Sequence, residues 1–344
     1  MMKAVVKSKK GVGFVELLDV PKPQPGPNEV LVEVRAAGIC GTDIHIYHDE
    51  FTYSPPVVLG HEFCGIVADV GKDVEAWKPG DRVTSETAGY VCGRCRYCRT
   101  GRYNLCPKRL GLGYHLNGAF ARYIVVPRPE ILHRLPDNVD FISGALCEPS
   151  AVATHGVIEL TDISGGDFVA VLGEGPLGLL ALQVAKSAGA ETVAVTGIIE
   201  ARLEMARNLG ADFTINAKQE DPVKAVMDLT EGYGADVVLE CSGSPIAARQ
   251  GLQMVRKAGS YTQLGLFGKP IEIDLDQIAY KELRATGVFS QRWSAWETAL
   301  KLIASGKLLT KPLVTHIFPI TEWKKGFDVM ENKAGIKVVL TPVD

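Results

Sequence analysis

The chain has 344 residues, a length that favours two domains over one. Hydrophobic residues make up 46% of it and charged residues 22%, which is ordinary for a globular protein. The formal net charge of −3 argues against a nucleic acid or an anionic membrane as partner. The sequence shows neither the apolar core of a secretory signal nor an apolar run of membrane-spanning length, so we expect a cytoplasmic protein.

Residues 1 to about 150 predict a compact, partly antiparallel β domain. The segments are short runs rich in Val and Ile that Gly and Pro interrupt, and apolar and polar residues alternate in 30–36. The expected strands are 3–7, 29–40, 64–71, 81–87 and 121–127.

A cluster of cysteines follows the fourth of these strands. Its members are spaced C-x2-C-x2-C-x7-C and are Cys92, Cys95, Cys98 and Cys106. In a cytoplasmic protein such a cluster binds metal more often than it forms disulfides. Four thiolates complete a tetrahedral zinc shell and leave no open position, so we expect a structural zinc here. A redox-active C-x-x-C pair and a chance clustering are the alternatives.

From about residue 152 strands and helices alternate, which predicts an α/β fold with a doubly wound parallel sheet of the Rossmann type. After about residue 290 the chain returns to one helix and two short strands, and we interpret this tail as rejoining the first domain. The expected strands are 167–173, 191–197, 213–216, 236–243, 260–268, 283–289, 315–320 and 337–343, and the expected helices are 173–190, 201–211, 223–230, 247–259 and 299–307.

A glycine motif, G-x-G-x-x-G, joins the first strand of this segment to its first helix. We expect Gly173 to permit a tight turn, Gly175 to let the backbone approach a pyrophosphate, and Gly178 to pack the helix closely on the strand. The first helical turn, which includes Pro176 and Leu177, supplies free N–H groups for phosphate. In this context the motif predicts NAD or NADP binding, whereas alone it would indicate only a turn.

The next strand ends in Thr196 and Gly197, where an NAD enzyme usually carries an acidic residue for the ribose 2′-hydroxyl. A missing carboxylate removes a repulsive element against a 2′-phosphate, and Arg202 would attract one, so the pattern favours NADP. Glu200 is close enough in sequence to supply the acidic group and so to reverse the preference for NADP. A solvated position on a helix would also explain Arg202.

Three separated residues offer ligands for a second metal: Cys40, His61 and Glu148. A catalytic zinc usually has three protein ligands and one open position. Taken singly, each residue is also explained as a buried small thiol, a core or surface histidine, or a solvated carboxylate.

The segments GHEFCGIVADVG (60–71) and CGTDIH (40–45) resemble the zinc-dependent medium-chain dehydrogenases. The family pattern G-H-E-x-x-G-x-V-x-x-x-G matches at every fixed position, and the cysteine cluster, the Glu-Pro pair at 148–149 and the glycine motif follow in family order. The resemblance covers nearly the whole chain. It implies a GroES-like catalytic domain (residues 1–151, completed by 290–344), a Rossmann domain (152–289) and an active site in the cleft between them.

The resemblance also implies a role for each matching residue. Cys40, His61 and Glu148 would hold the catalytic zinc, and Glu62 would bind the zinc-bound water or enter as a fourth ligand. Thr42 and His45 would relay the proton of the alcohol. The four clustered cysteines would hold the structural zinc.

Glu148, where many relatives have Cys, is similar to the polyol (sorbitol-type) and threonine dehydrogenases. We therefore expect NAD(P)-linked interconversion of a secondary alcohol, such as a polyol or sugar alcohol, and its ketone. Oxidation of L-threonine or of a small diol is the first alternative, and a non-catalytic, zinc-stabilised structural relative is the second. The resemblance further implies a homotetramer or homodimer.

The substrate pocket departs from the sorbitol-type pattern. Those enzymes carry an Arg directly after the Phe that corresponds to Phe289, whereas Ser290 and Gln291 follow here and the nearest Arg is Arg292. Tyr47, Phe289 and Arg292 are the candidates for contact with a small-molecule substrate, whose identity the pattern leaves open. Each is also explained by ordinary packing or by a place on the surface.

Overall fold

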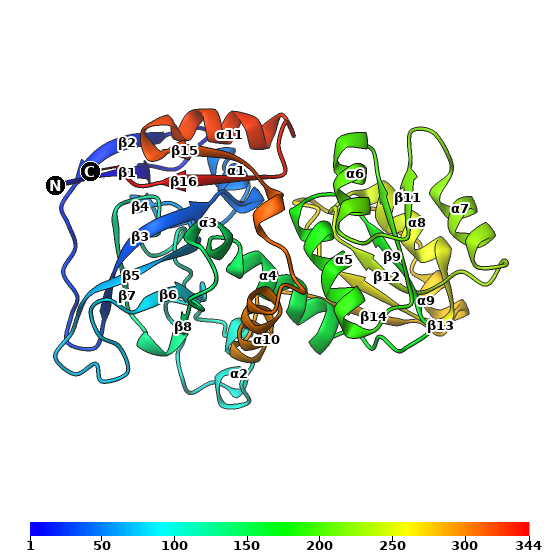
Figure 1. Cartoon of the computed structure of the whole chain (residues 1–344), viewed down its shortest axis with the longest axis horizontal. Coiled ribbons are helices and arrows are strands. Elements are labelled where there is room, and N and C mark those ends of the chain that lie inside the picture. Colours follow the sequence, from blue (N-terminus) through cyan, green and yellow to red (C-terminus); the bar gives the residue numbers. More distant parts are fainter. Residues whose placement is uncertain (344) are drawn as a thin grey trace. The chain divides into compact units, whose positions relative to one another are not determined.

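The computed structural model describes residues 1–343. The chain forms two compact units (Figure 1). The first unit contains Met1–Glu148, Gln291–Ala304 and the segment from Thr310 on, and the second contains Pro149–Ser290 and Ser305–Leu309. In the described part of the chain, no helix combines the length and the apolar character that crossing a bilayer would need.

The first unit contains a seven-stranded and a three-stranded sheet. The larger has the order β15-β16-β3-β5-β6-β8 with β7 also paired to β3, and all its pairs are antiparallel except β15–β16. The C-terminal strand β16 thus lies beside β3 from the first part of the chain. The strands of this unit are β1 Met2–Lys7, β2 Val15–Val20, β3 Val30–Gly38, β4 Val57–Val58, β5 Glu62–Val70, β6 Arg82–Ser85, β7 Tyr123–Val126, β8 Leu132–Arg134, β15 Val314–Pro319 and β16 Lys337–Thr341.

The core of the first unit consists mainly of Val, Ile, Leu and aromatic side chains from these strands and from the segments between them, closed by α11 through Trp323 and Phe327. The helical segments are short: α1 Gly41–Tyr47, α2 Arg96–Arg99, η1 Tyr103–Leu105, η2 Pro129–Ile131, α3 Phe141–Gly144, α10 Trp293–Ala304, η4 Lys311–Leu313, η5 Ile320–Glu322 and α11 Trp323–Glu331. Helix α4 (Cys147–Thr154), which continues as a π-helical turn η3 (His155–Glu159), begins in the first unit and continues in the second.

The second unit is a six-stranded, all-parallel sheet with the order β11-β10-β9-β12-β13-β14. This is the doubly wound order, which confirms the predicted α/β fold class. Its elements are β9 Phe168–Leu172, α5 Pro176–Ala188, β10 Thr192–Gly197, α6 Glu200–Asn208, β11 Phe213–Asn216, α7 Pro222–Leu229, β12 Ala235–Glu240, α8 Pro245–Met254, β13 Val255–Gln263, α9 Asp276–Tyr280 and β14 Arg284–Gly287.

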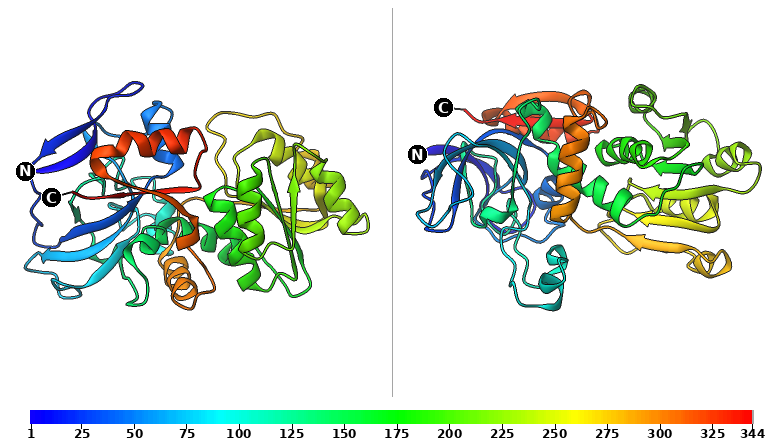
Figure 2. Two further views of the ribbon diagram at one scale, coloured as in Figure 1. Left: turned by 45° about the horizontal axis from the view of Figure 1, so that its top comes forward. Right: turned by 60° about the horizontal axis from the view of Figure 1, so that its bottom comes forward.

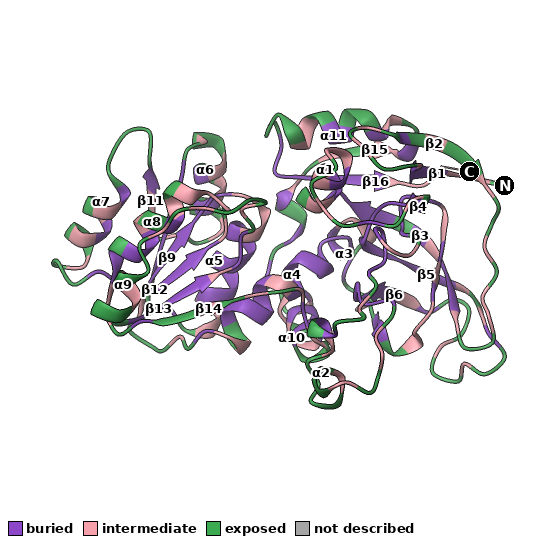
Figure 3. Ribbon diagram, turned by 180° about the vertical axis from the view of Figure 1, so that it is seen from behind, coloured by how far each residue is buried: buried purple, intermediate pink, exposed green. Residues whose placement is uncertain are grey.

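Helices lie on both sides of the parallel sheet: α5 contacts α6, whereas α8 contacts α7 and α9 (Figure 2). The central strands are almost wholly buried, as their continuous apolar sequences predict (Figure 3). Helix α8 ends at Met254, so the expectation of a helix to residue 259 was wrong. The segment 255–259 instead opens β13, where Arg256 binds the side chain of Asp236 on β12 (Nε–Oδ1 2.5 Å).

Candidate active site and zinc sites

Three side chains of the first unit converge on one point. The Cys40 thiol, a His61 ring nitrogen and a Glu62 carboxylate oxygen all lie within 4.8 Å of one another. Cys40 is the N-cap residue of α1, His61 directly precedes β5 and Glu62 opens it. His61 and Glu62 are buried and Cys40 is partly exposed. A thiolate, an imidazole and a carboxylate are donors that zinc accepts, so this cluster fits a zinc ion.

Glu148 lies outside this cluster but close enough for its charge to act on His61. It stands in the first turn of α4 and is 7% exposed. Burial raises the pKa of Glu148 to about 7, and the nearby His61 opposes that rise. A buried carboxyl whose charge acts on the imidazole of His61 is the kind of group that a third metal ligand requires.

Asp43, which the sequence analysis did not single out, orients the cluster from α1. Its side chain is fully buried, and its Oδ2 accepts the backbone N–H of Cys40 at 2.9 Å. Its Oδ1 lies 3.7 Å from Nδ1 of His61, and neither of these two atoms has a hydrogen-bond partner. A carboxylate beside Nδ1 directs the other ring nitrogen toward a metal. Burial lowers the pKa of His61, but the charges of Asp43 and Cys40 outweigh it and raise that pKa well above its usual value.

Lys337, which the sequence analysis also missed, binds Glu62. Its ammonium nitrogen lies 2.7 and 2.5 Å from the two carboxylate oxygens and 3.1 Å from the carbonyl oxygen of Ile39. Lys337 opens β16, where one charged residue precedes an apolar run, and it is 2% exposed. Glu62, expected to bind a zinc-bound water or to ligate zinc, is therefore paired with an ammonium group within the protein.

The residues expected to relay a proton lie on α1. Thr42 Oγ1 is 3.6 Å from the Cys40 sulfur. His45 lies three residues further along the helix, and its Nδ1 is 2.8 Å from the Glu50 carboxylate on the surface. The order Thr42 then His45 therefore runs from the metal cluster toward solvent.

Tyr47, a pocket candidate, also lies on α1 and packs its ring edge-on against Phe327 of α11.

The four clustered cysteines form a second potential zinc site, and the described structure records all of them as free thiols. All four sulfurs lie within 4.8 Å of one another, and Cys98 Sγ lies 3.5 Å from Cys95 Sγ and 4.0 Å from Cys92 Sγ. A tetrahedral ion with Zn–S bonds of about 2.3 Å separates its sulfurs by about 3.8 Å, so the spacing fits zinc. Backbone N–H groups of Arg94 and Cys95 lower the pKa of Cys92 to about 6, which favours the thiolate.

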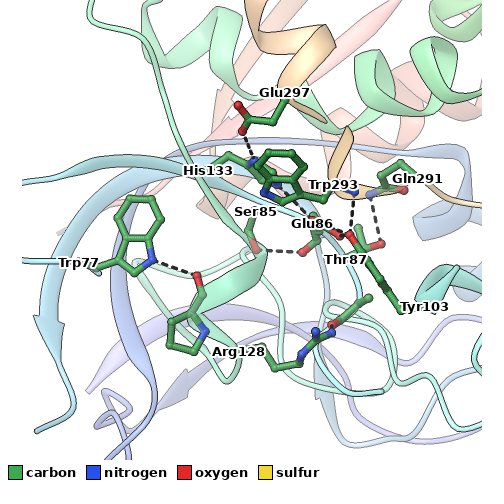
Figure 4. A network of polar contacts seen from close by, with 12 residues as sticks. Trp77, Ser85, Glu86, Thr87, Tyr103, Arg128, His133, Gln291, Trp293 and Glu297 are labelled. Atoms are coloured by element: carbon green, nitrogen blue, oxygen red, sulfur yellow. Dashed lines mark hydrogen bonds and ion pairs between the residues drawn. The ribbon is translucent and has the colours of Figure 1, made fainter. Parts of the chain in front are cut away.

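A buried polar network anchors this cysteine lobe to the rest of the first unit (Figure 4). Tyr103 in η1 donates to Glu86, whose oxygens lie 2.9 and 2.7 Å away, and accepts the backbone N–H of Trp293 at 2.7 Å. His133 of β8 bridges Glu86 and Glu297 of α10, at 3.2 and 2.9 Å. The lobe is thereby joined to β8 and to the start of α10.

The same network fixes the chain around Arg292, one of the pocket candidates. Gln291 is 2% exposed and donates to the Thr87 hydroxyl at 3.5 Å, and Trp293 binds Tyr103. Arg292 between them is half-buried, whereas Phe289 belongs to the second unit and is 47% exposed. The structure therefore holds the backbone on either side of Arg292 in place.

Replacing Tyr103 with phenylalanine is expected to destabilise the first unit by about 1.5–3 kcal/mol, because buried Glu86 loses a hydrogen-bond donor. The measurement is urea unfolding followed by tryptophan fluorescence. Tyr97→Phe is the matched control, because Tyr97 lies on the same lobe and its side chain is 41% exposed. Equal stability of the two variants would contradict the anchoring role of Tyr103.

The glycine motif of the second unit has the geometry of a dinucleotide loop. Gly173 has a φ of +108°, and a Cβ on Gly178 would overlap the carbonyl oxygen of Gly173. A Cβ on Gly175 would meet no atom within 4 Å, so space remains open at the N-terminus of α5. Helix α5 begins with Pro176 and Leu177 and has no side-chain cap, which leaves its first N–H groups for a phosphate. These features fit a bound NAD(P).

Thr196 and Gly197 close β10, and Arg202 lies half-buried on α6. The sequence analysis missed a further residue here. Glu174, inside the glycine motif, reaches across to β10, and its Oε1 accepts the N–H groups of Ile198 and Ile199, each at 3.0 Å.

Comparisons with known proteins agree with this geometry. The model of the alcohol dehydrogenase GroES-like domain matches residues 26–137, and that of the zinc-binding dehydrogenases matches residues 176–305. A sorbitol dehydrogenase of Halalkalibacterium halodurans is 46% identical over 100% of both chains. An L-threonine 3-dehydrogenase of Bacillus velezensis is 40% identical over 99% of each chain.

Solved structures give the same result. The crystal structure of a zinc-binding dehydrogenase of Sinorhizobium meliloti bound to NADP has a TM-score of 0.92 and 37% identity, over 99% of each chain. The fold class, the zinc and NAD(P) cofactors and the oxidoreductase activity on CH–OH groups are thereby confirmed. The chain belongs to the zinc-dependent medium-chain dehydrogenases, in the branch that contains the polyol and threonine dehydrogenases.

Proposed function

We propose that this enzyme oxidises a secondary hydroxyl of a polyol or sugar alcohol to the ketone, with NAD(P) as acceptor. The observation that carries the proposal is the convergence of Cys40, His61 and Glu62 in a chain 46% identical, over its whole length, to a sorbitol dehydrogenase. Cys40, His61 and Glu148 are the proposed ligands of the catalytic zinc, and the four clustered cysteines are those of the structural zinc.

When bound, zinc would polarise the substrate oxygen as a Lewis acid, and the nicotinamide would accept the hydride. The chain's own residues prepare that chemistry. The Asp43 carboxylate lies 3.7 Å from Nδ1 of His61, and Lys337 balances the charge of Glu62. Thr42, beside the Cys40 sulfur, is the proposed first carrier of the hydroxyl proton, and His45, whose side chain is 44% exposed, is the proposed group that releases it to water. The proton then leaves separately from the hydride.

In the second unit, the glycine loop and the N-terminus of α5 are proposed to hold the pyrophosphate of NAD(P), through Gly173, Gly175, Pro176, Leu177 and Gly178. Thr196, Gly197 and Arg202 are proposed to lie beside the adenosine ribose. Tyr47, Phe289 and Arg292 are the proposed substrate-pocket residues.

The test is an initial-rate panel that follows reduced nicotinamide with sorbitol, xylitol, galactitol, inositol, 2,3-butanediol and L-threonine, each with NAD and with NADP. We expect turnover of at least one polyol. Turnover of threonine alone would instead support the second candidate, which the 40% identity to an L-threonine 3-dehydrogenase favours. No turnover of any substrate by zinc-loaded protein would contradict both candidates.

Oligomeric state and location are also proposals. The resemblance to the polyol and threonine dehydrogenases supports a homotetramer or homodimer, and a mass of one chain in light scattering would contradict it. A cytoplasmic location is supported by the eight cysteines, none of which forms a disulfide, since a reducing compartment disfavours disulfides.

A further inference from the structure

The fold supplies a carboxylate at the end of β10, where the sequence of that strand has none. Glu174 stands between Gly173 and Gly175 of the glycine motif, yet its side chain reaches the turn after β10. There its Oε1 accepts the N–H groups of Ile198 and Ile199, each at 3.0 Å. Two bonds to consecutive backbone groups fix the carboxylate in one place.

The carboxyl group of Glu174 occupies the space that a side chain at position 197 would need. A Cβ on Gly197 would overlap the carboxyl carbon of Glu174. The carboxylate therefore lies where a side chain from position 197 would begin, which is where dinucleotide folds usually carry their ribose-binding acid. Glu174 is only 7% exposed, so its charge is held at this point and is poorly screened by solvent. NADP was favoured because the sequence of β10 has no carboxylate at this point, whereas the folded chain has one.

We propose that Glu174 selects NAD over NADP, with its carboxylate accepting a hydrogen bond from the ribose 2′-hydroxyl and repelling a 2′-phosphate. The inference rests on the proposed function, because it assumes that the glycine loop binds a nicotinamide dinucleotide. The carboxylate has one oxygen engaged by Ile198 and Ile199, which leaves the other for the hydroxyl. A 2′-phosphate would meet the same negative charge and would find those two N–H groups already occupied.

Arg202 does not reverse this preference. Burial lowers the pKa of its guanidinium, and the charge of Glu174 opposes that shift, so the two groups are electrostatically linked. The attraction that Arg202 would offer to a phosphate is therefore offset by the neighbouring carboxylate. Glu200, the other acid near this turn, already has both carboxylate oxygens engaged, by Arg207 at 2.9 Å and by Asn216 at 3.0 Å.

The test measures binding rather than turnover. Dissociation constants of NADH and NADPH are determined by nicotinamide fluorescence for the zinc-loaded enzyme, and those of 5′-ADP and 2′,5′-ADP by calorimetry. We expect the native enzyme to bind NADH at least about tenfold more tightly than NADPH. In Glu174→Gln, which keeps the shape and removes the charge, the ratio should fall by about tenfold, chiefly through tighter NADPH binding. The two adenosine fragments should show the same change.

Glu204→Gln is the matched control, because it removes one charge from α6 at a residue whose carboxylate binds Arg207. It should leave the ratio unchanged. A ratio that stays the same in Glu174→Gln while NADH still binds would overturn this inference alone. Failure of the native enzyme to bind either dinucleotide would overturn the proposed function as well.

A second pair of variants tests whether the preference for NADH follows the carboxylate when it is moved from position 174 to position 197. Gly197→Asp alone should weaken both dinucleotides, because its Cβ has no room beside Glu174. Glu174→Ala combined with Gly197→Asp returns an acid to the usual place and should restore the preference for NADH. A double variant that binds NADPH as tightly as NADH would contradict the proposed role of a carboxylate at this point.

Discussion

Replacing His61 or Cys40 with alanine is expected to remove one zinc ion per chain and to lower kcat/KM for the best substrate by about a thousandfold or more. The magnitude follows from losing a Lewis acid worth several kcal/mol in the transition state, at about 1.4 kcal/mol per tenfold. Both residues belong to the cluster of Cys40, His61 and Glu62, whose ligand atoms lie within 4.8 Å of one another. The measurements are metal analysis by atomic emission and initial rates with the substrate found in the panel.

Cys64→Ala is the matched control, because Cys64 is a buried thiol on β5, three residues from His61, that donates to the carbonyl oxygen of Phe141 and lies in no metal cluster among the described residues. It should keep both zinc ions and most of its activity. Full activity in Cys40→Ala with one zinc fewer would place the catalytic metal elsewhere. Loss of both metals would indicate that the variant fails to fold, and circular dichroism would identify that case.

The sequence predicted those parts of the protein whose signal is local. The apolar runs of 167–173 and 191–197 correspond to β9 and β10. They were predicted correctly because a strand that is buried on both faces has a continuous apolar sequence, which can be recognised without knowing its neighbouring strands. The four clustered cysteines were grouped from their spacing alone, because all four come from one short loop, and the structure brings their sulfurs within 4.8 Å of one another. His61 and Cys40 are separated in sequence, and only the resemblance to a family connected them.

The sequence analysis missed two kinds of residue. Some contact partners that are far away in the sequence, and others have a side chain that extends to a neighbouring strand. Lys337 lies 275 residues from Glu62 and meets it because β16 pairs with β3, which in turn pairs with β5. Glu174 lies 24 residues before Ile198, and its position inside a glycine motif gave no indication that it would reach β10. Pattern reasoning places residues on elements, but it does not show which side chains meet across a sheet.

Replacing Lys337 with methionine is expected to destabilise the first unit by about 3–5 kcal/mol, because it leaves the carboxylate of Glu62 buried without its counter-charge. Both groups are at most 3% exposed, so water cannot substitute for the lost ammonium group. All four tryptophans (Trp77, Trp293, Trp296 and Trp323) belong to the first unit. Urea unfolding followed by tryptophan fluorescence therefore reports on this unit.

The double variant Glu62→Gln with Lys337→Met separates a lost contact from an unpaired charge. It removes both charges together, so it should recover much of the stability that Lys337→Met loses, as neutral replacements of buried ion pairs often do. Lys324→Met, at an exposed lysine on α11, should change stability by less than about 0.5 kcal/mol. If the double variant is no more stable than Lys337→Met, the ammonium group stabilises the unit mainly through the carbonyl of Ile39. If it recovers, the loss in Lys337→Met comes from the buried carboxylate of Glu62 left without its counter-charge, and β16 then supplies the residue that pairs with Glu62 in the candidate active site.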